Sequence, residues 1–185
     1  MELIKTVQNQ KILKSLTVIF LGSILLTISA KIKIPFIFSP IPMTMQTFVV
    51  LFLGVSFGYK IGLATVSLYL FEGIIGIPVF SNSPEKGVGL IYFTGPTMGY
   101  LIGFLFATFL AGYINLKTNI FLIFIKLLLC VSIIYILGML WLGSLIGWDK
   151  PIFELGALPF LLAELFKICL LTLLTRIVIN FRKFI

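Results

Sequence analysis

The sequence predicts an all-α integral membrane protein, a bundle of six transmembrane helices with both termini in the cytoplasm. Of its 185 residues, 60% are hydrophobic and 11% are charged, which leaves too little polar surface for a soluble domain of this length. Six apolar segments account for most of the chain, and all eight prolines lie in alternate gaps between them. Because alternate gaps of a membrane bundle open on the same side, that side is expected to carry the long, shaped loops.

The apolar segments are candidate transmembrane spans that together form one membrane domain over residues 1–185. A helix needs about 20 residues to cross a bilayer, so the second and third segments are short, and neighbouring loops are expected to dip to membrane depth. The other side of the bundle carries only short turns, Phe57–Lys60 and Tyr113–Thr118. The candidate spans are 16–30, 42–57, 61–77, 96–114, 120–145 and 159–179.

The net charge of +8 is explained by the positive-inside rule, so no nucleic acid partner is expected. About seven cations lie on the side of the termini and about four on the proline-rich side. This asymmetry predicts a multi-pass protein of the plasma membrane with cytoplasmic termini and outward proline-rich loops. The first group comprises Lys5, Lys11, Lys14, Lys60, Lys117, Arg182 and Lys183, and the second comprises Lys31, Lys33, Lys86 and Lys150.

The first segment also has the layout of a cleaved signal peptide. It has a basic start, an apolar stretch and a small-residue end at Ser29–Ala30. Five further apolar segments follow it, which favours a retained first helix.

Missing residue types exclude most catalytic chemistry. The chain has no histidine, which rules out histidine-ligated metals and serine–histidine nucleophiles, and its single aspartate, Asp149, rules out an aspartyl pair. No phosphate-binding loop is present, so uphill transport driven by ATP would require another chain to bind the nucleotide. No metal and no cofactor is expected. A small intramembrane enzyme using Glu72 or Glu164 as acid–base remains an alternative, as does a structural or channel-like bundle.

Glu164 and Lys167 are the most informative polar residues. They lie three residues apart near the start of the last segment and therefore share a helix face, about one turn below the outer surface. Ionisable groups at this depth are costly and usually face a cavity or a partner. A carboxylate accepts N–H donors and an ammonium donates to carbonyl or acidic groups, so the pair predicts a ligand site. The alternative is that the two side chains pair with each other.

Proline at the start of three inward-running helices indicates where a ligand site would lie. Pro42, Pro96 and Pro159 suit the first helical position, and the positive ends of these helix dipoles would favour an anionic group on the outer side. The first outer loop, 31–44, is too apolar for a solvated connection. It is expected to act either as a lid over a ligand or as an interfacial anchor through Phe36 and Phe38.

Small residues recur every four positions along the fourth segment and predict close helix packing. This spacing places Thr94, Thr97 and Tyr100 at the rim of a cavity. In the second outer loop, Ser81, Asn82 and Tyr92 supply neutral hydrogen-bonding groups. The small residues are Gly95, Gly99, Gly103, Ala107 and Ala111.

Four ordered stretches resemble the BioY family, the biotin-binding S components of energy-coupling factor (ECF) transporters. They are Ser39-Pro-Ile-Pro-Met-Thr-Met-Gln-Thr-Phe, Gly76-Ile-Pro-Val-Phe, Thr94-Gly-Pro-Thr-Met-Gly-Tyr-Leu-Ile-Gly-Phe and Pro159-Phe-Leu-Leu-Ala-Glu-Leu-Phe-Lys. The resemblance implies a biotin site on the outer side of a six-helix bundle. It also implies uptake of biotin in partnership with a transmembrane coupling protein and two cytoplasmic ATPases, without enzymatic activity of the chain itself.

The resemblance implies that Glu164 and Lys167 hold polar groups of biotin and that the loop around Phe80–Asn82 completes the site. The chain departs from the family at Glu164, where aspartate is usual, and at Met98, where a second glycine is usual. An S component for another vitamin, thiamin or riboflavin, is therefore kept as an alternative. The predicted ligand residues are Thr44, Gln46, Phe80, Ser81, Asn82, Tyr92, Glu164 and Lys167.

Overall fold

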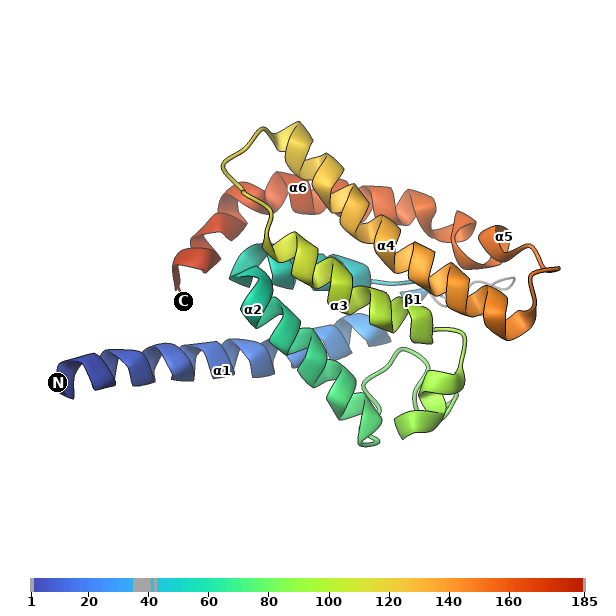
Figure 1. The fold of residues 1–185 in the computed structure, drawn as a ribbon, viewed down its shortest axis with the longest axis horizontal. Helices are drawn as coiled ribbons and strands as arrows, with labels where there is room; N and C mark the ends of the chain where they lie inside the picture. Colours follow the sequence, from blue (N-terminus) through green and yellow to red (C-terminus); the bar gives the residue numbers. More distant parts are fainter. Residues whose placement is uncertain (1, 35–40, 42, 185) are drawn as a thin grey trace.

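The described residues form a bundle of helices and a two-stranded ladder (Figure 1). The computed structural model describes the backbone of residues 2–34, 41 and 43–184, and the side chains of 8–33, 41 and 43–182. The elements in order are α1 (Glu2–Lys31), β1 (Lys33–Ile34), β2 (Met43–Thr44), α2 (Gln46–Ile74), η1 (Gly89–Thr94), α3 (Met98–Gly112), α4 (Ile120–Ile146), α5 (Ile152–Gly156), η2 (Leu158–Phe160) and α6 (Leu161–Phe184).

Within the described part of the chain, four helical stretches are long and apolar enough to cross a membrane. Helix α3 is also apolar, but with 15 residues it is shorter than these four stretches. The four stretches are Gln8–Lys31, Gln46–Ile74, Ile120–Ile146 and Ile152–Arg182.

The predicted second and third spans, 42–57 and 61–77, both overlap α2, which is interrupted at Gly58. Its φ of 79° and ψ of 172° are not helical, and a positive φ is strained for any residue with a Cβ. The helical halves on either side, 46–57 and 59–74, run in different directions (Figure 1). The turn that the sequence predicted at Phe57–Lys60 therefore exists, although it is tighter than a loop.

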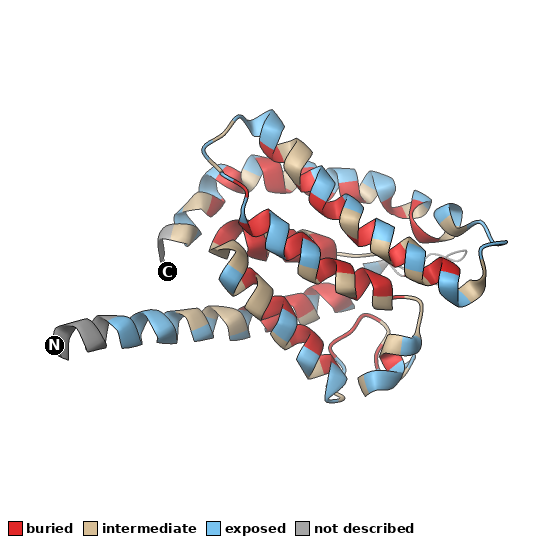
Figure 2. Ribbon diagram, in the orientation of Figure 1, coloured by how far each residue is buried: buried red, intermediate tan, exposed pale blue. Residues whose placement is uncertain are grey.

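Helix α3 packs closely against α4 through its small residues, as the four-residue spacing predicted. A Cβ atom added to Gly103 would lie 2.7 Å from the Cα atom of Ile134, so the two backbones are in direct contact. Ala107 and Ala111, further along α3, are completely buried. Buried residues concentrate where the helices face one another, and the outer faces are exposed (Figure 2).

Helix α1 lies along one side of the bundle, and its N-terminal part extends beyond the other helices (Figure 1). Its contact with α2 includes a hydrogen bond of 2.9 Å from the Ser23 hydroxyl to Glu72, and Leu26 and Ala30 are fully buried. Large apolar side chains such as Leu13 and Phe20 are exposed on the remaining surface, as expected where a helix faces lipid.

At the far end of the chain, Arg182 joins α6 to the ends of two other helical segments. Its guanidinium group donates to the carbonyl oxygens of Val55, Gly112 and Ile114 at 2.7, 3.0 and 3.1 Å. These carbonyls lie where helices end and lack an intrahelical donor, so a cation is favourable there.

The proline-rich connections contain structure that the sequence did not predict. β1 and β2 form an antiparallel pair in which Lys33 faces Thr44, and α5 lies in the connection before α6. Pro96 lies two residues before α3, and Pro159 lies in η2 immediately before α6, close to the predicted positions. The predicted roles of Phe36, Phe38 and Pro42 concern residues outside the described part of the chain.

Candidate ligand-binding cavity

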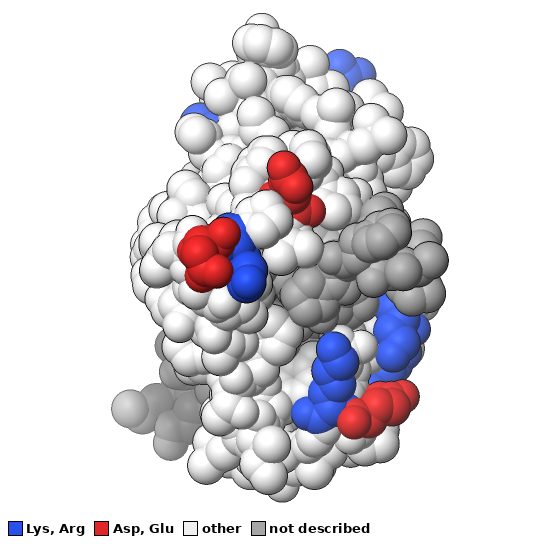
Figure 3. All heavy atoms as spheres, turned by 90° about the vertical axis from the view of Figure 1, so that its right-hand side faces the viewer, with Lys and Arg blue, Asp and Glu red and all other residues white. Residues whose placement is uncertain are grey.

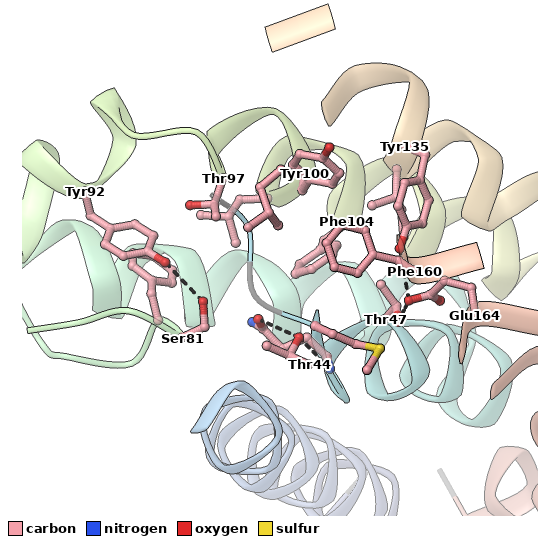
Figure 4. A pocket seen from close by; sticks show the side chains of 16 residues that line it. Thr44, Thr47, Ser81, Tyr92, Thr97, Tyr100, Phe104, Tyr135, Phe160 and Glu164 are labelled. Carbon is pink, nitrogen blue, oxygen red and sulfur yellow. Dashed lines mark hydrogen bonds between the residues drawn. The ribbon is translucent and has the colours of Figure 1, made fainter. Parts of the chain in front are cut away.

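A cavity of about 50 Å³ lies where the three proline-rich connections meet the helices (Figure 4). Thr44 comes from the first connection, Phe80, Ser81 and Tyr92 from the second, and Phe160 from the third. The polar residues are few, and most of the wall is aromatic or aliphatic, as is typical of small-molecule sites.

Glu164, in the first turn of α6, forms part of the wall and accepts three hydrogen bonds on a single oxygen. Its Oε1 accepts from the Lys167 ammonium at 2.8 Å, the Thr47 hydroxyl at 2.9 Å and the Tyr135 hydroxyl at 3.2 Å. The side chains of Glu164 and Lys167 are each only 6% exposed. The two residues therefore pair with each other, and the pair also belongs to the cavity wall.

The second carboxylate oxygen of Glu164, Oε2, is buried and has no hydrogen-bond partner among the described residues. A buried acceptor left unsatisfied costs roughly 1–3 kcal/mol, and more when it carries charge. Such an oxygen can accept a hydrogen bond from a bound molecule that supplies an N–H or O–H group.

Lys167 lies behind Glu164 rather than on the cavity surface. Its ammonium donates to the backbone carbonyl of Thr44 at 2.6 Å and to the Thr47 hydroxyl at 3.0 Å, in addition to Glu164. On its other side, Lys167 borders an apolar groove of about 680 Å³ between the first connection and α6. Lys167 thus fixes the Glu164 carboxylate and the Thr44 backbone in relation to each other.

An aromatic cluster forms the opposite end of the cavity. The Phe80 ring stacks on Tyr92 with centroids 4.6 Å apart and meets Tyr69 edge-on at 5.4 Å. The Tyr92 hydroxyl lies 3.2 Å from the hydroxyl of Ser81, within hydrogen-bond distance. These groups give this end of the cavity apolar faces with two hydroxyls at the edge.

Gln46, at the start of α2, links Thr44 in the cavity wall to this aromatic cluster. Its side-chain nitrogen donates to the Tyr69 hydroxyl at 2.7 Å, and its oxygen accepts from the Thr44 hydroxyl at 3.3 Å. The Tyr69 hydroxyl in turn donates to the carbonyl of Val79, next to Phe80. Gln46 therefore lines the cavity and also, through Tyr69, helps to hold the backbone next to Phe80 in place.

Six of the eight predicted residues line the cavity, and the other two do not. Lys167 acts through Glu164 and Thr44. Asn82 donates only a backbone N–H, to the Tyr92 hydroxyl at 3.4 Å, and its side chain is not part of the wall. The six are Thr44, Gln46, Phe80, Ser81, Tyr92 and Glu164.

Among the rim residues expected at and before the fourth apolar segment, Thr97 and Tyr100 line the cavity, whereas Thr94 is exposed and bonds to the Ile91 carbonyl. The sequence reasoning missed Thr47 and Tyr135. Tyr135 is a hydroxyl-bearing side chain in the middle of a mostly apolar helix, and this pattern was the available signal. In the described residues, no group of three or more potential metal ligands comes together.

Residues 4–183 match the sequence profile of the BioY family, which confirms the resemblance carried by the four motifs. The probable biotin transporter BioY of Pyrococcus horikoshii is 33% identical over 154 residues, which cover 83% of this chain and 89% of that protein. The biotin transporter BioY of Thermotoga maritima is 32% identical over 151 residues, covering 81% of this chain and 86% of that one.

A solved structure has the same fold. The crystal structure of the S-component for biotin from an ECF-type ABC transporter superposes with a TM-score of 0.78 at 30% identity, covering 95% of this chain and 93% of the other. The shared fold, together with the apolar helices, places this chain among multi-pass membrane proteins.

Proposed function

Because this chain belongs to the BioY family, we propose that it captures biotin with high affinity and supplies it for uptake, as the substrate-specific subunit of an ECF-type transporter. The observation that carries the proposal is the Glu164 carboxylate in the cavity wall, whose Oε2 is buried without a partner among the described residues. The relatives named as biotin transporters and the biotin S-component with the same fold support it.

The chemistry of the cavity suits the parts of biotin. Its ureido group carries N–H donors that can bond to Glu164 Oε2. The apolar ring and chain of biotin match the faces of Phe80, Tyr92 and Phe160. Glu164 is one methylene longer than the usual aspartate, and Lys167 and Tyr135 both hold its carboxylate in place.

Binding of a whole vitamin requires the cavity to widen. Its volume of about 50 Å³ accommodates a few water molecules, whereas ligand pockets usually have volumes of roughly 300 Å³ or more. The loop that carries Phe80 and Ser81 has no helical backbone, and neither has the first connection with Met43 and Thr44, so the cavity can widen at these parts of the wall without moving a helix.

The proposed topology has six membrane crossings in one domain over residues 1–185, with cytoplasmic termini and the cavity on the outer side of the plasma membrane. The reversal at Gly58 supports two crossings by the halves of α2. Helix α3, with 15 residues, is about 22 Å long at 1.5 Å per residue. It is shorter than the roughly 30 Å hydrocarbon core, so its ends would lie within the bilayer.

The proposed partners are a transmembrane coupling protein and two cytoplasmic ATPases, along with the lipid bilayer. The sequence contains no phosphate-binding loop, so energy from ATP has to come from other chains. The similarity to the S-component of an ECF-type ABC transporter supports this assembly. The members of this family are transporter components and not enzymes, and this disfavours the alternative of an intramembrane enzyme.

A competition experiment tests the substrate. Purified protein loaded with labelled biotin should release the label when unlabelled biotin is added, and retain it with equal concentrations of thiamin or riboflavin. If thiamin or riboflavin displaces the label as well as biotin does, the assignment of biotin as the specific ligand is wrong. Glu164→Gln is the matched variant, since it keeps the side-chain shape but removes the anionic acceptor, and we expect it to lose most of the bound label.

A further inference from the structure

Lys31, the last residue of α1, bonds to the loop that forms one wall of the cavity. Its ammonium donates to the carbonyl oxygen of Ser83 at 2.6 Å and to that of Phe80 at 2.8 Å, and lies 3.4 Å from the Ser83 hydroxyl. The Ser83 hydroxyl also donates to the Phe80 carbonyl at 2.8 Å. One cation therefore holds two carbonyls of a short loop, 80–83, whose Phe80 and Ser81 side chains line the cavity.

Lys33, two residues after the end of α1, makes a second set of contacts with the cavity wall. Lys33 donates to the carbonyl of Ser81 at 3.1 Å. In the strand pair, Lys33 also lies opposite Thr44, whose side chain lines the other wall. Lys31 at the end of α1 and Lys33 in β1 thus contact two walls of the cavity that come from different parts of the chain.

Loop 80–83 has no regular helix or strand of its own, so its position depends on side-chain contacts. Phe80, Ser81 and Ser83 are all nearly fully buried, at 1%, 5% and 2% exposure. Buried carbonyls need donors. The Phe80 carbonyl accepts from the Ser83 N–H and hydroxyl as well as from Lys31, whereas the Ser83 carbonyl accepts its short, charge-assisted bond from Lys31.

We propose that Lys31 is a positioning residue for the cavity: its ammonium ties the end of α1 to loop 80–83 and keeps a bound ligand from leaving. The inference rests on the proposed function, because it concerns the same cavity. It also gives α1 a role in retention: a movement of α1 away from the bundle would withdraw Lys31 from the Phe80 and Ser83 carbonyls and loosen the wall.

Attraction of an anionic ligand by surface charge is a different explanation for lysines near the cavity. In Figure 3, the basic and acidic side chains of the described residues on the face at the loop end lie in small mixed groups. Glu85, two residues after Ser83, interacts electrostatically with Lys31 and offsets its field. The directed bonds of Lys31 to two carbonyls therefore favour positioning over long-range attraction.

The test compares Lys31→Met with Lys31→Arg and with Lys86→Met in full-length protein. Methionine keeps the length of the side chain without donors or charge, and arginine restores both. Lys86 is exposed in the same connection and bonds to loop 80–83 through its backbone N–H, which donates to the Asn82 carbonyl, so Lys86→Met removes the same charge and leaves that bond in place. The measurements are the association and dissociation rates of biotin and hydrogen exchange of the backbone amides.

We expect Lys31→Met to raise the dissociation rate about fivefold with an unchanged association rate, because two charge-assisted bonds are lost at a partly exposed site. Exchange should accelerate in residues 77–84 and stay unchanged in α4. Lys31→Arg should restore the rate to within about twofold of the parent, and Lys86→Met should match the parent.

Three results would overturn the inference: dissociation within twofold of the parent in Lys31→Met, an equal fall in association rate for Lys31→Met and Lys86→Met, or faster exchange throughout the bundle. Should Lys31→Met not fold, Lys31→Gln, which retains an N–H donor on a shorter side chain, is judged by the same rates. Absence of biotin binding in the parent protein would instead contradict the proposed function, so the two failures are distinguishable.

Discussion

Tyr135 on α4 donates a hydrogen bond of 3.2 Å from its hydroxyl to the carboxylate of Glu164 on α6, although the two residues lie 29 positions apart. The same Tyr135 ring meets Tyr100 edge-on, with centroids 5.8 Å apart. One side chain therefore connects three helices at the cavity wall. This arrangement fixes the direction in which the carboxylate can receive a ligand.

Replacing Tyr135 with phenylalanine should weaken biotin binding about threefold to tenfold while leaving the fold intact. The ring contacts remain, but Glu164 loses one neutral donor, worth about 0.5–1.5 kcal/mol. The affinity from calorimetry and the melting temperature measure the two effects separately. Tyr113→Phe, at an exposed position after α3, is the control and should bind like the parent. An unchanged affinity in Tyr135→Phe would show that the Tyr135 hydroxyl does not contribute to biotin binding.

Single and double variants of the Glu164–Lys167 pair should affect protein stability and biotin binding differently. Glu164→Gln and Lys167→Met each leave the other charge buried without its counterion, so each should destabilise the protein by about 3–5 kcal/mol. The double variant should recover a large part of that loss, because no uncompensated charge remains. It should still fail to bind biotin, since the anionic acceptor is gone. Recovery of binding in the double variant would show that the pair serves structure alone.

Arg182 should matter for stability and not for ligand affinity. Arg182→Gln removes charge-assisted bonds to the carbonyls of Val55, Gly112 and Ile114 and should lower the free energy of unfolding by about 2 kcal/mol. Arg176→Gln, exposed on the same helix, is the matched control and should have little effect. If Arg182→Gln changed the affinity for biotin more than twofold, the prediction that Arg182 acts on stability and not on ligand binding would be wrong.

Trp141 should report ligand binding through its fluorescence, and Trp148 should not. The Trp141 indole N–H donates to the carbonyl of Gly95 at 2.8 Å and so contacts the segment that leads to Thr97 in the cavity wall. Trp148 is 62% exposed in the connection after α4. A biotin-dependent change in emission should therefore persist in Trp148→Phe and disappear in Trp141→Phe. The opposite pattern would place the ligand nearer to the connection between α4 and α5.

Much of the fold was predictable, because apolar length and proline position are local properties. The predicted spans 120–145 and 159–179 overlap α4 and α6 closely. The interruption of α2 was also visible, since Gly58 and Lys60 mark the end of an apolar segment. The β1–β2 pair was not predictable, because two-residue strands have no periodicity and depend on the path of the chain between them.

The candidate site was predictable only in part. Glu164 and Lys167 could be paired because three residues on a helix set their distance. Thr47 and Tyr135 come from two other helices, and sequence spacing says nothing about how those helices meet α6. Asn82 was expected to line the cavity from its place in the loop, yet only its backbone N–H is engaged there.

The measurement that tests the central claim most directly is a calorimetric titration of the purified, folded chain with biotin, alongside Glu164→Gln. The account predicts saturable binding at about one biotin per chain, and loss of most of that affinity in the variant. Folded parent protein that binds no biotin, or a Glu164→Gln variant that binds as tightly as the parent, would contradict it.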